Sequence, residues 1–253
     1  MHIEQYGDGP DLVLVHGWSF HSGVWQPLLQ TLTASYRVHL IDLPGHGRSD
    51  WQAQGFALDK ILVEWQQRLP DNAIWLAWSL GGLLSIAMAD RYPEKVSKLI
   101  LLAATPCFVQ RDDWTTAMTA EVFEAFAASL CGDVQQTLQR FILLQAKGAE
   151  QSRDTIQQLS EQLSQQRPAD PQALQAGLKV LQEADLRAAM VRLQCPLQFI
   201  LGERDNLVPV SLAHAVPLLQ PTSQVSVIAR AGHAPLLSHP QQCQSIIESF
   251  IYG

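Results

Sequence analysis

Residues 73–84 (AIWLAWSLGGLL) constrain the fold of this chain more than any other stretch. An apolar run rich in aromatic and β-branched residues stops at Ser79, two glycines follow, and an alanine-rich segment continues at helical spacing to Met88. The pattern predicts a nucleophile elbow, in which a strained turn between strand and helix lifts the serine hydroxyl clear of the sheet edge. Ala77 stands where the pattern usually has its first glycine, which is the smallest possible change. The alternative is a buried strand whose Ser79 only caps the next helix.

Composition narrows the class of protein. The 253 residues are long enough to bury one large core, and a content of 47% hydrophobic and 16% charged residues indicates a compact globular chain and not a disordered one. The net charge of −7 and the lack of a basic run argue against nucleic-acid binding. No apolar run has the length that crosses a membrane, and the first residues lack the features of a signal peptide.

The cysteines are scattered without the spacing of metal ligands. They are Cys107, Cys131, Cys195 and Cys243. Free, mostly buried thiols in a reducing cytoplasm are the simplest explanation, and none resembles a nucleophile. We therefore expect a cytoplasmic protein without a metal site. We also expect no cofactor and a monomer, although nothing in the sequence sets the oligomeric state.

Strand-like and helix-like segments alternate along most of the chain. Buried strands are predicted at 11–17, 36–42, 73–78, 98–103, 196–202 and 225–228, with helices at 25–32, 58–65 and 241–251. Residues 111–184 have no convincing strand, are rich in glutamine, and predict about four helices. The chain therefore predicts an α/β core, 1–110 and 185–253, with a mostly parallel, doubly wound sheet, interrupted by a helical lid at 111–184.

Two later loops supply the groups that a serine nucleophile needs. A serine hydroxyl requires an adjacent base, and that base requires an orienting acid. Asp205 follows the strand at 196–202, and His233 follows the last strand, so both are expected at the carboxyl edge of the sheet. Glu203 competes with Asp205, but Asp205 is deeper in the turn and is preferred, which leaves Glu203 as a surface or loop-fixing group. The alternative for Asp205 is an aspartate that only forms a turn, and the alternative for His233 is a loop histidine bonded only to backbone.

A reaction through Ser79 also needs donors for the oxyanion of a tetrahedral intermediate. The backbone N–H of Leu80, which follows the nucleophile, is one candidate, and the N–H of Trp18 in the loop after the first core strand is the other. Losing one such donor typically costs on the order of 10²–10³ in rate. His16 precedes this loop and is expected to brace it. The alternative for His16-Gly17-Trp18 is a tight turn with a packing aromatic residue.

Taken together, these motifs resemble the α/β-hydrolase superfamily over the whole chain. They are His16-Gly17-Trp18, residues 42–49 (DLPGHGRS), the elbow, residues 202–205 (GERD) and residues 232–235 (GHAP). A narrower set is similar to the carboxylesterases of biotin synthesis, which hydrolyse the methyl ester of pimeloyl-acyl carrier protein. This set comprises residues 75–82 (WLAWSLGG), 104–108 (ATPCF), 111–114 (RDDW), 140–145 (RFILLQ) and 184–187 (ADLR).

The narrower resemblance implies a substrate and a partner. It implies that an acyl pocket is lined by Trp18, Ser79, Leu80, Phe141 and Gln145. It also implies that Arg140 and Arg153 of the lid, with Lys147 contributing less, meet the phosphopantetheine or the acidic acyl carrier protein. Fixed cations would steer such an anionic partner. The alternative is that Arg140, Lys147 and Arg153 are ordinary solvated charges on helix surfaces. Glutamines at Gln136 and Gln157 stand where further basic residues would be expected.

Two other kinds of function fit the same scaffold. One is a different hydrolase, such as a short-chain carboxylesterase acting on small esters, a lactonase or a carbon–carbon bond hydrolase, because specificity depends on lid and pocket. The other is a ligand-binding receptor without catalysis. A complete set of nucleophile, base and acid with two oxyanion donors argues against a receptor.

Overall fold

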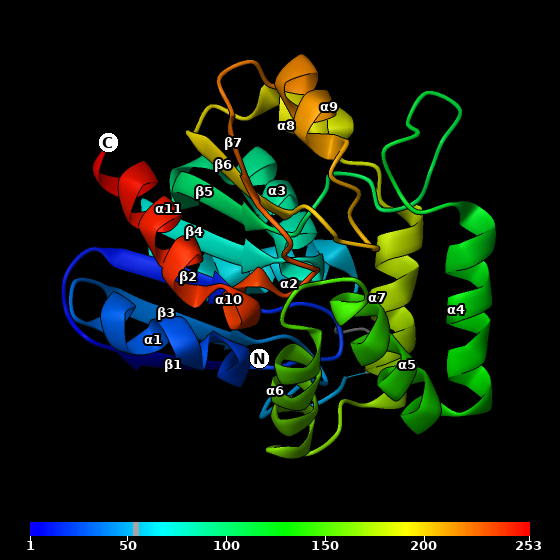
Figure 1. Cartoon of the computed structure of the whole chain (residues 1–253). Helices are drawn as coiled ribbons and strands as arrows, with labels where there is room; N and C mark the ends of the chain where they lie inside the picture. The colour runs from blue at the N-terminus through cyan, green and yellow to red at the C-terminus, as the bar shows by residue number, and fades with distance from the viewer. Residues whose placement is uncertain (53–55) are drawn as a thin grey trace.

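The computed structural model describes residues 1–52 and 56–253, which form a twisted sheet between helices with a helical layer beside it (Figure 1). The strands of the described residues follow the order β1-β3-β2-β4-β5-β6-β7. Only β1 is antiparallel to its neighbour, and the other pairs are parallel. Their bounds are β1 His2–Tyr6, β2 Asp11–Val15, β3 Arg37–Asp42, β4 Ala73–Trp78, β5 Val96–Leu102, β6 Leu197–Gly202 and β7 Gln224–Ile228.

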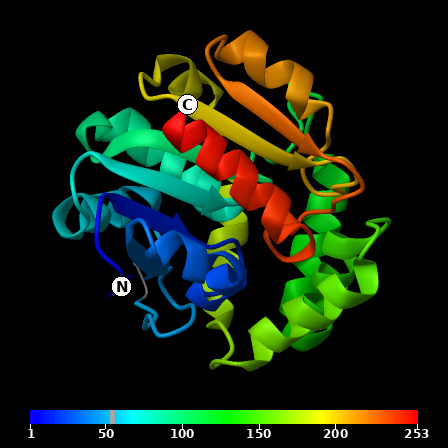
Figure 2. The same cartoon turned by 60° about the vertical axis from the view of Figure 1, so that its left-hand side comes forward.

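Helices cover both faces of this sheet (Figures 1 and 2). On one face α1 (Gln26–Thr33) packs against α11 (Pro240–Tyr252), and on the other α3 (Leu80–Arg91) packs against α2 (Leu58–Arg68) and α8 (Arg187–Arg192). The remaining core helices are η1 Ser22–Trp25, η2 Pro93–Lys95, α9 Leu212–Leu219 and α10 Pro235–Ser238. Two covered faces explain why the central strands are continuous apolar runs without alternation.

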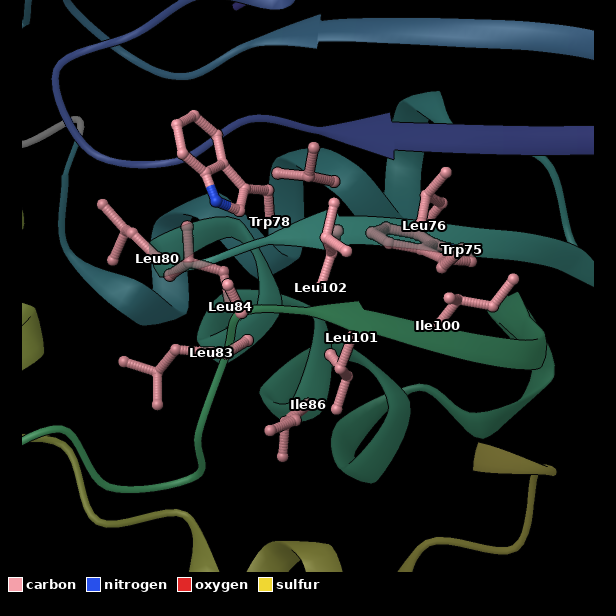
Figure 3. Close-up of a cluster of buried hydrophobic side chains, with 14 of the residues drawn as sticks. Trp75, Leu76, Trp78, Leu80, Leu83, Leu84, Ile86, Ile100, Leu101 and Leu102 are labelled. Atoms are coloured by element: carbon pink, nitrogen blue, oxygen red, sulfur yellow. The ribbon is translucent and has the colours of Figure 1, made fainter. Parts of the chain in front are cut away.

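The centre of the core lies where β4, β5 and α3 meet (Figure 3). Every residue of β4 is buried, and so is α3 from Leu80 to Ala89. Trp75 of β4, Leu101 of β5 and Ile86 of α3 are all fully buried. Full burial of such a side chain stabilises the fold by about 1.5–3 kcal/mol. The elbow turn is thus held between two of the most completely buried elements of the molecule.

The segment 111–184 holds four helices beyond the carboxyl ends of the strands (Figure 1). They are α4 Ala120–Gly132, α5 Val134–Ala146, α6 Ser152–Ser164 and α7 Pro171–Glu183. Thr119, Asp133 and Asp170 cap three of them by accepting a backbone N–H with the side chain, which fixes where each helix begins. We call these four helices the lid; the division of the chain into core and lid stays a prediction. Among the described residues no helix is long and apolar enough to cross a membrane.

Candidate active site

The backbone at Ser79 has the strained conformation expected of an elbow. Its φ of 54° and ψ of −117° are rarely adopted by a residue with a side chain. A Cβ on Gly81 would lie 2.6 Å from the carbonyl oxygens of Val15 and His16, and one on Gly82 would lie 2.4 Å from the Cβ of Ala104. Both positions therefore require glycine, because neighbouring atoms lie too close for a side chain. Ala77 lies within regular β4, so a methyl group at that position costs the turn nothing.

Ser79, His233 and Asp205 form one continuous chain of hydrogen bonds. His233 Nδ1 lies 2.8 Å from Asp205 Oδ2, and His233 Nε2 lies 2.9 Å from Ser79 Oγ. An ionised carboxylate can only accept, so the imidazole carries its proton on Nδ1 and presents Nε2 to the serine hydroxyl as an acceptor. The second oxygen, Asp205 Oδ1, accepts the backbone N–H groups of Leu207 at 2.7 Å and Val208 at 3.0 Å. The carboxylate is thereby fixed at both oxygens.

The backbone of His233 is held on both sides as well. Its N–H donates to the carbonyl of Gln145 in lid helix α5 at 2.9 Å, and its carbonyl accepts the indole N–H of Trp78 at 2.8 Å. His233 is fully buried. The sequence did not predict either contact. Trp78, the aromatic residue immediately before Ser79, was the one feature that could have indicated the second contact.

Glu203, the competing acid, points to a different partner. Its Oε2 accepts the backbone N–H of Arg230 at 2.8 Å, which fixes the loop that precedes His233. The carboxylate bonded to the imidazole belongs to Asp205. Geometry therefore favours Asp205 as the orienting acid and gives Glu203 a loop-fixing contact.

The two candidate oxyanion donors approach Ser79 from the turn after β2 and from α3. Leu80 is the first residue of α3, so its N–H has no acceptor within the helix. Trp18 follows Gly17, and a Cβ on Gly17 would lie 3.2 Å from the Cβ of Ser79. Glycine thus lets the Trp18 loop approach the elbow closely. The role of both N–H groups as oxyanion donors stays a prediction.

A buried apolar pocket opens at Ser79 and His233. Of the residues predicted to bind substrate, Trp18, Ser79 and Phe141 line this pocket, whereas Leu80 and Gln145 are not among its lining residues. Gln145 is fully buried, and neither polar atom of its side chain has a hydrogen-bond partner among the described residues. The rest of the wall comprises Phe108, Met118, Val122, Phe123, Phe126, Leu144, Leu178, Leu181 and Leu207. Most of this wall comes from the lid.

The three cations predicted to meet a carrier protein lie on the outside of the lid. Arg140 is on α5, Lys147 directly follows it, and Arg153 is in the first turn of α6; all three are exposed. None forms an ion pair with any residue that the structure describes. Leu143, on the same stretch of α5, is 54% exposed. The structure thus leaves three exposed, unpaired cations on α5, after it and on α6, with an exposed leucine between Arg140 and Lys147 in the sequence.

Two other histidines are buried behind the Trp18 loop. His16 donates from Nδ1 to the carbonyl of Gly17 at 2.7 Å and accepts the N–H of Leu43 at Nε2 at 2.9 Å, so it braces the loop as a neutral ring. Burial, together with the neighbouring His46, lowers the pKa of His16 to about 3. Burial also lowers the pKa of His46 to about 4. Within 1–52 and 56–253 no group of three or more His, Cys, Asp or Glu side chains is arranged to hold a metal ion.

Comparison with known proteins agrees with this fold. The model of the alpha/beta hydrolase family matches residues 12–243, and the chain belongs to that family. This confirms the fold class predicted from the motifs, including the mostly parallel sheet.

The curated relatives are more specific. The pimeloyl-[acyl-carrier protein] methyl ester esterase of Xanthomonas oryzae pv. oryzae (strain MAFF 311018) is 41% identical over 251 residues, covering 99% of this chain and 98% of that protein. The protein of the same name from Aeromonas hydrophila subsp. hydrophila is 41% identical over 253 residues, covering 98% of each. Among solved structures, an esterase from Exiguobacterium antarcticum superposes with a TM-score of 0.90 over 100% of this chain and 95% of its own. At 23% identity that likeness concerns the fold alone.

Proposed function

We propose that this chain is a serine carboxylesterase that hydrolyses the methyl ester of pimeloyl-acyl carrier protein, leaving the free pimeloyl carboxylate for biotin synthesis. The observation that carries the chemistry is the chain of hydrogen bonds from Asp205 through His233 to Ser79, ending at an apolar pocket. The substrate is inferred from relatives that are 41% identical over nearly the full length. The proposed enzyme is a cytoplasmic monomer that uses neither metal nor cofactor.

In the acylation half of this mechanism, Ser79 Oγ attacks the ester carbonyl while His233 Nε2 takes the hydroxyl proton. The imidazolium that forms is stabilised by the carboxylate of Asp205. The negative oxygen of the tetrahedral intermediate accepts hydrogen bonds from the N–H groups of Leu80 and Trp18. Collapse breaks the bond to the methoxy group, which leaves as methanol with the proton from His233.

In the deacylation half, water replaces methanol and the same groups act again. His233 takes a proton from water, and the resulting hydroxide attacks the acyl carbon bonded to Ser79. The oxyanion again meets the donors at Leu80 and Trp18. Collapse returns the proton to Ser79 Oγ and releases the pimeloyl carboxylate, still joined to its carrier at the other end.

The pocket suits the acyl part of such a substrate. Its wall beyond the catalytic groups is entirely apolar, with Phe123, Phe126 and Phe141 from the lid. A polymethylene chain placed there loses contact with water at no cost in unsatisfied polar groups. The proposal therefore places the ester carbonyl at Ser79 and the polymethylene chain against the lid.

The carrier protein is proposed to dock on the outside of the lid. Arg140 and Arg153, with a smaller contribution from Lys147, supply positive charge, and Leu143, one turn after Arg140 on α5, supplies an exposed apolar contact. Attraction between oppositely charged surfaces raises the association rate and is screened by salt. A small ester that reaches the same pocket has no such dependence.

The test compares kcat/KM for the carrier-bound methyl ester, a free short-chain methyl ester, a lactone and a carbon–carbon bond substrate. The proposal expects the carrier-bound ester to be preferred, and expects Arg140→Ala/Arg153→Ala to lose activity selectively on it, with a weaker salt dependence than wild type. Lys179→Ala is the matched control. Lys179 lies on a different lid helix, α7, where it forms an ion pair with Glu183 of the same helix. A preference for the lactone or the carbon–carbon substrate would refute the proposed substrate. Equal losses on both esters would mean that the arginines support the lid itself.

A further inference from the structure

Gly177 is a glycine in the middle of a lid helix, where the sequence offers no reason for one. It lies in α7 and is buried. Glycine in a helix interior is less favourable than alanine, because it loses more backbone freedom on folding. A buried interior glycine therefore calls for a close contact that a methyl group would prevent.

That contact is with the two residues that carry the proposed oxyanion donors. A Cβ on Gly177 would lie 2.8 Å from Cδ1 and 3.3 Å from Nε1 of Trp18, and 3.4 Å from Cδ2 of Leu80. The first distance is closer than real Cβ contacts allow, whereas the last is ordinary van der Waals contact. The indole of Trp18 thus packs against the backbone of Gly177, in the space that a side chain at position 177 would occupy.

The indole is held there by residues of three lid helices. Its Nε1–H donates to the carbonyl of Leu174, also in α7, at 2.8 Å. Phe141 of α5 and Phe126 of α4 meet its ring edge-on, with centroids at 4.9 Å and 5.6 Å. Trp18 itself is 1% exposed. Three lid helices therefore fix one side chain whose own backbone belongs to the core.

The helix cannot easily move away from a larger side chain at Gly177. The N–H of Asp170, the cap of α7, donates to the carbonyl of Gly45 in the core at 2.8 Å. A Cβ on Gly45 would lie 2.4 Å from the Cβ of Ala173, so the first turn of α7 already touches the core backbone. With the helix anchored, a methyl group at Gly177 would displace the indole of Trp18.

We propose that Gly177 is a positioning residue for the oxyanion hole. Because it lets the indole of Trp18 pack against α7, it determines where the backbone N–H of Trp18 points. This rests on the proposed ester hydrolysis and deepens it. The lid then acts on the chemical step, and does so equally for every ester that reacts at Ser79. An α7 that only shaped the acyl pocket would act through KM and only on long acyl chains.

The experiment measures Gly177→Ala on p-nitrophenyl acetate and on a long-chain p-nitrophenyl ester. Complete loss of one oxyanion donor costs on the order of 10²–10³, so a displaced donor should lower kcat by about 10- to 100-fold on both esters with KM nearly unchanged. Affinity for a trifluoromethyl ketone, which adds to Ser79 Oγ and places a negative oxygen in the hole, should fall by a similar factor. A merely structural defect would not move this affinity in step with kcat.

Gly132→Ala is the matched control. Gly132 is the last residue of lid helix α4, and a Cβ there meets nothing within 4 Å. Its kinetics should equal those of wild type. Unchanged kcat in Gly177→Ala, or a loss confined to KM for the long ester, would overturn the proposal.

A double-mutant cycle with Trp18→Phe keeps the proposal testable if the single variant folds poorly. The smaller ring should accommodate the methyl group, so adding Gly177→Ala to Trp18→Phe should change kcat by less than about threefold and should recover the fold. Equal losses in both backgrounds would overturn the proposal. A wild type that cleaves no ester would instead refute the proposed function, and one that cleaves short esters but not the carrier ester would refute only its substrate.

Discussion

Replacing Asp205 by asparagine tests how the candidate site fixes the protonation state of its histidine. Asp205 Oδ1 accepts the N–H groups of Leu207 and Val208, and Oδ2 accepts Nδ1–H of His233. Asparagine has the same shape but only one accepting oxygen. If that oxygen stays with the two backbone donors, the amide NH₂ faces Nδ1 of the imidazole.

That orientation reverses the tautomer. Nδ1 must then accept, so the proton moves to Nε2, which can no longer take the proton of Ser79. Turning the amide would restore the tautomer but would leave two buried backbone donors without an acceptor, at about 1–3 kcal/mol each. The wrong tautomer is therefore the lower-energy state. Such a change lowers kcat by on the order of 10⁴, which corresponds to about 5.4 kcal/mol at 1.36 kcal/mol per factor of ten.

The assay is the steady-state hydrolysis of a p-nitrophenyl ester, with thermal unfolding to verify that the variant is folded. Glu203→Gln is the matched control, because a glutamine oxygen can still accept the N–H of Arg230. Its activity should stay within a few-fold of wild type. An Asp205→Asn enzyme within tenfold of wild type, or a larger loss in Glu203→Gln, would refute the reasoning.

Two further predictions follow from buried groups. Ser79→Ala should abolish ester hydrolysis and leave the fold intact, since only the hydroxyl at the end of the hydrogen-bonded chain is removed; activity within tenfold of wild type in a pure preparation would contradict this. The free energy of unfolding should fall as pH drops below about 6.5, because His16 and His46, with pKa values lowered to about 3 and about 4, stay neutral when folded but protonate when unfolded. At pH 5 each contributes about 2 kcal/mol of this loss. In urea denaturation at pH 7 and pH 5, His46→Asn should reduce the loss of unfolding free energy by the contribution of His46. An unchanged pH dependence of stability in this variant would contradict the prediction.

Most of the strands that the sequence predicted are buried on both faces. The exception is β7, predicted at 225–228, which lies at the other edge of the sheet and is mostly exposed or half-buried. The central strands β2, β4, β5 and β6 each contain a short continuous apolar run, and at this length, with turn residues beside it, such a run is typical of a buried strand. The strand it missed, β1, lies antiparallel at the sheet edge and is exposed or half-buried along its whole length. Its pairing depends on the neighbouring strand and not on its own composition. An edge strand of this kind leaves little periodic signal.

The candidate site was predictable where residues follow strands. Ser79, Asp205 and His233 each come after a recognisable strand, so parallel topology alone brings them to one edge. What could not be predicted is which distant segment holds each of them. The carbonyl of Gln145 that accepts the His233 N–H is 88 residues away, and no periodicity links an α5 backbone atom to that loop.

The hydrogen bonds between lid and core are distributed unevenly, and this bears on how a substrate reaches Ser79. After α5, the chain is tied to the catalytic loops by Asn206 Nδ2 to the carbonyl of Lys147 at 2.7 Å and Arg204 Nη1 to the carbonyl of Gly148 at 2.9 Å. Helix α7 is tied by the indole of Trp18. Helix α4 has no hydrogen bond to the core within the described residues and contributes apolar side chains to the pocket wall. Moving the whole lid would break bonds that orient His233 and Trp18, whereas moving α4 alone would expose the pocket and leave those bonds in place.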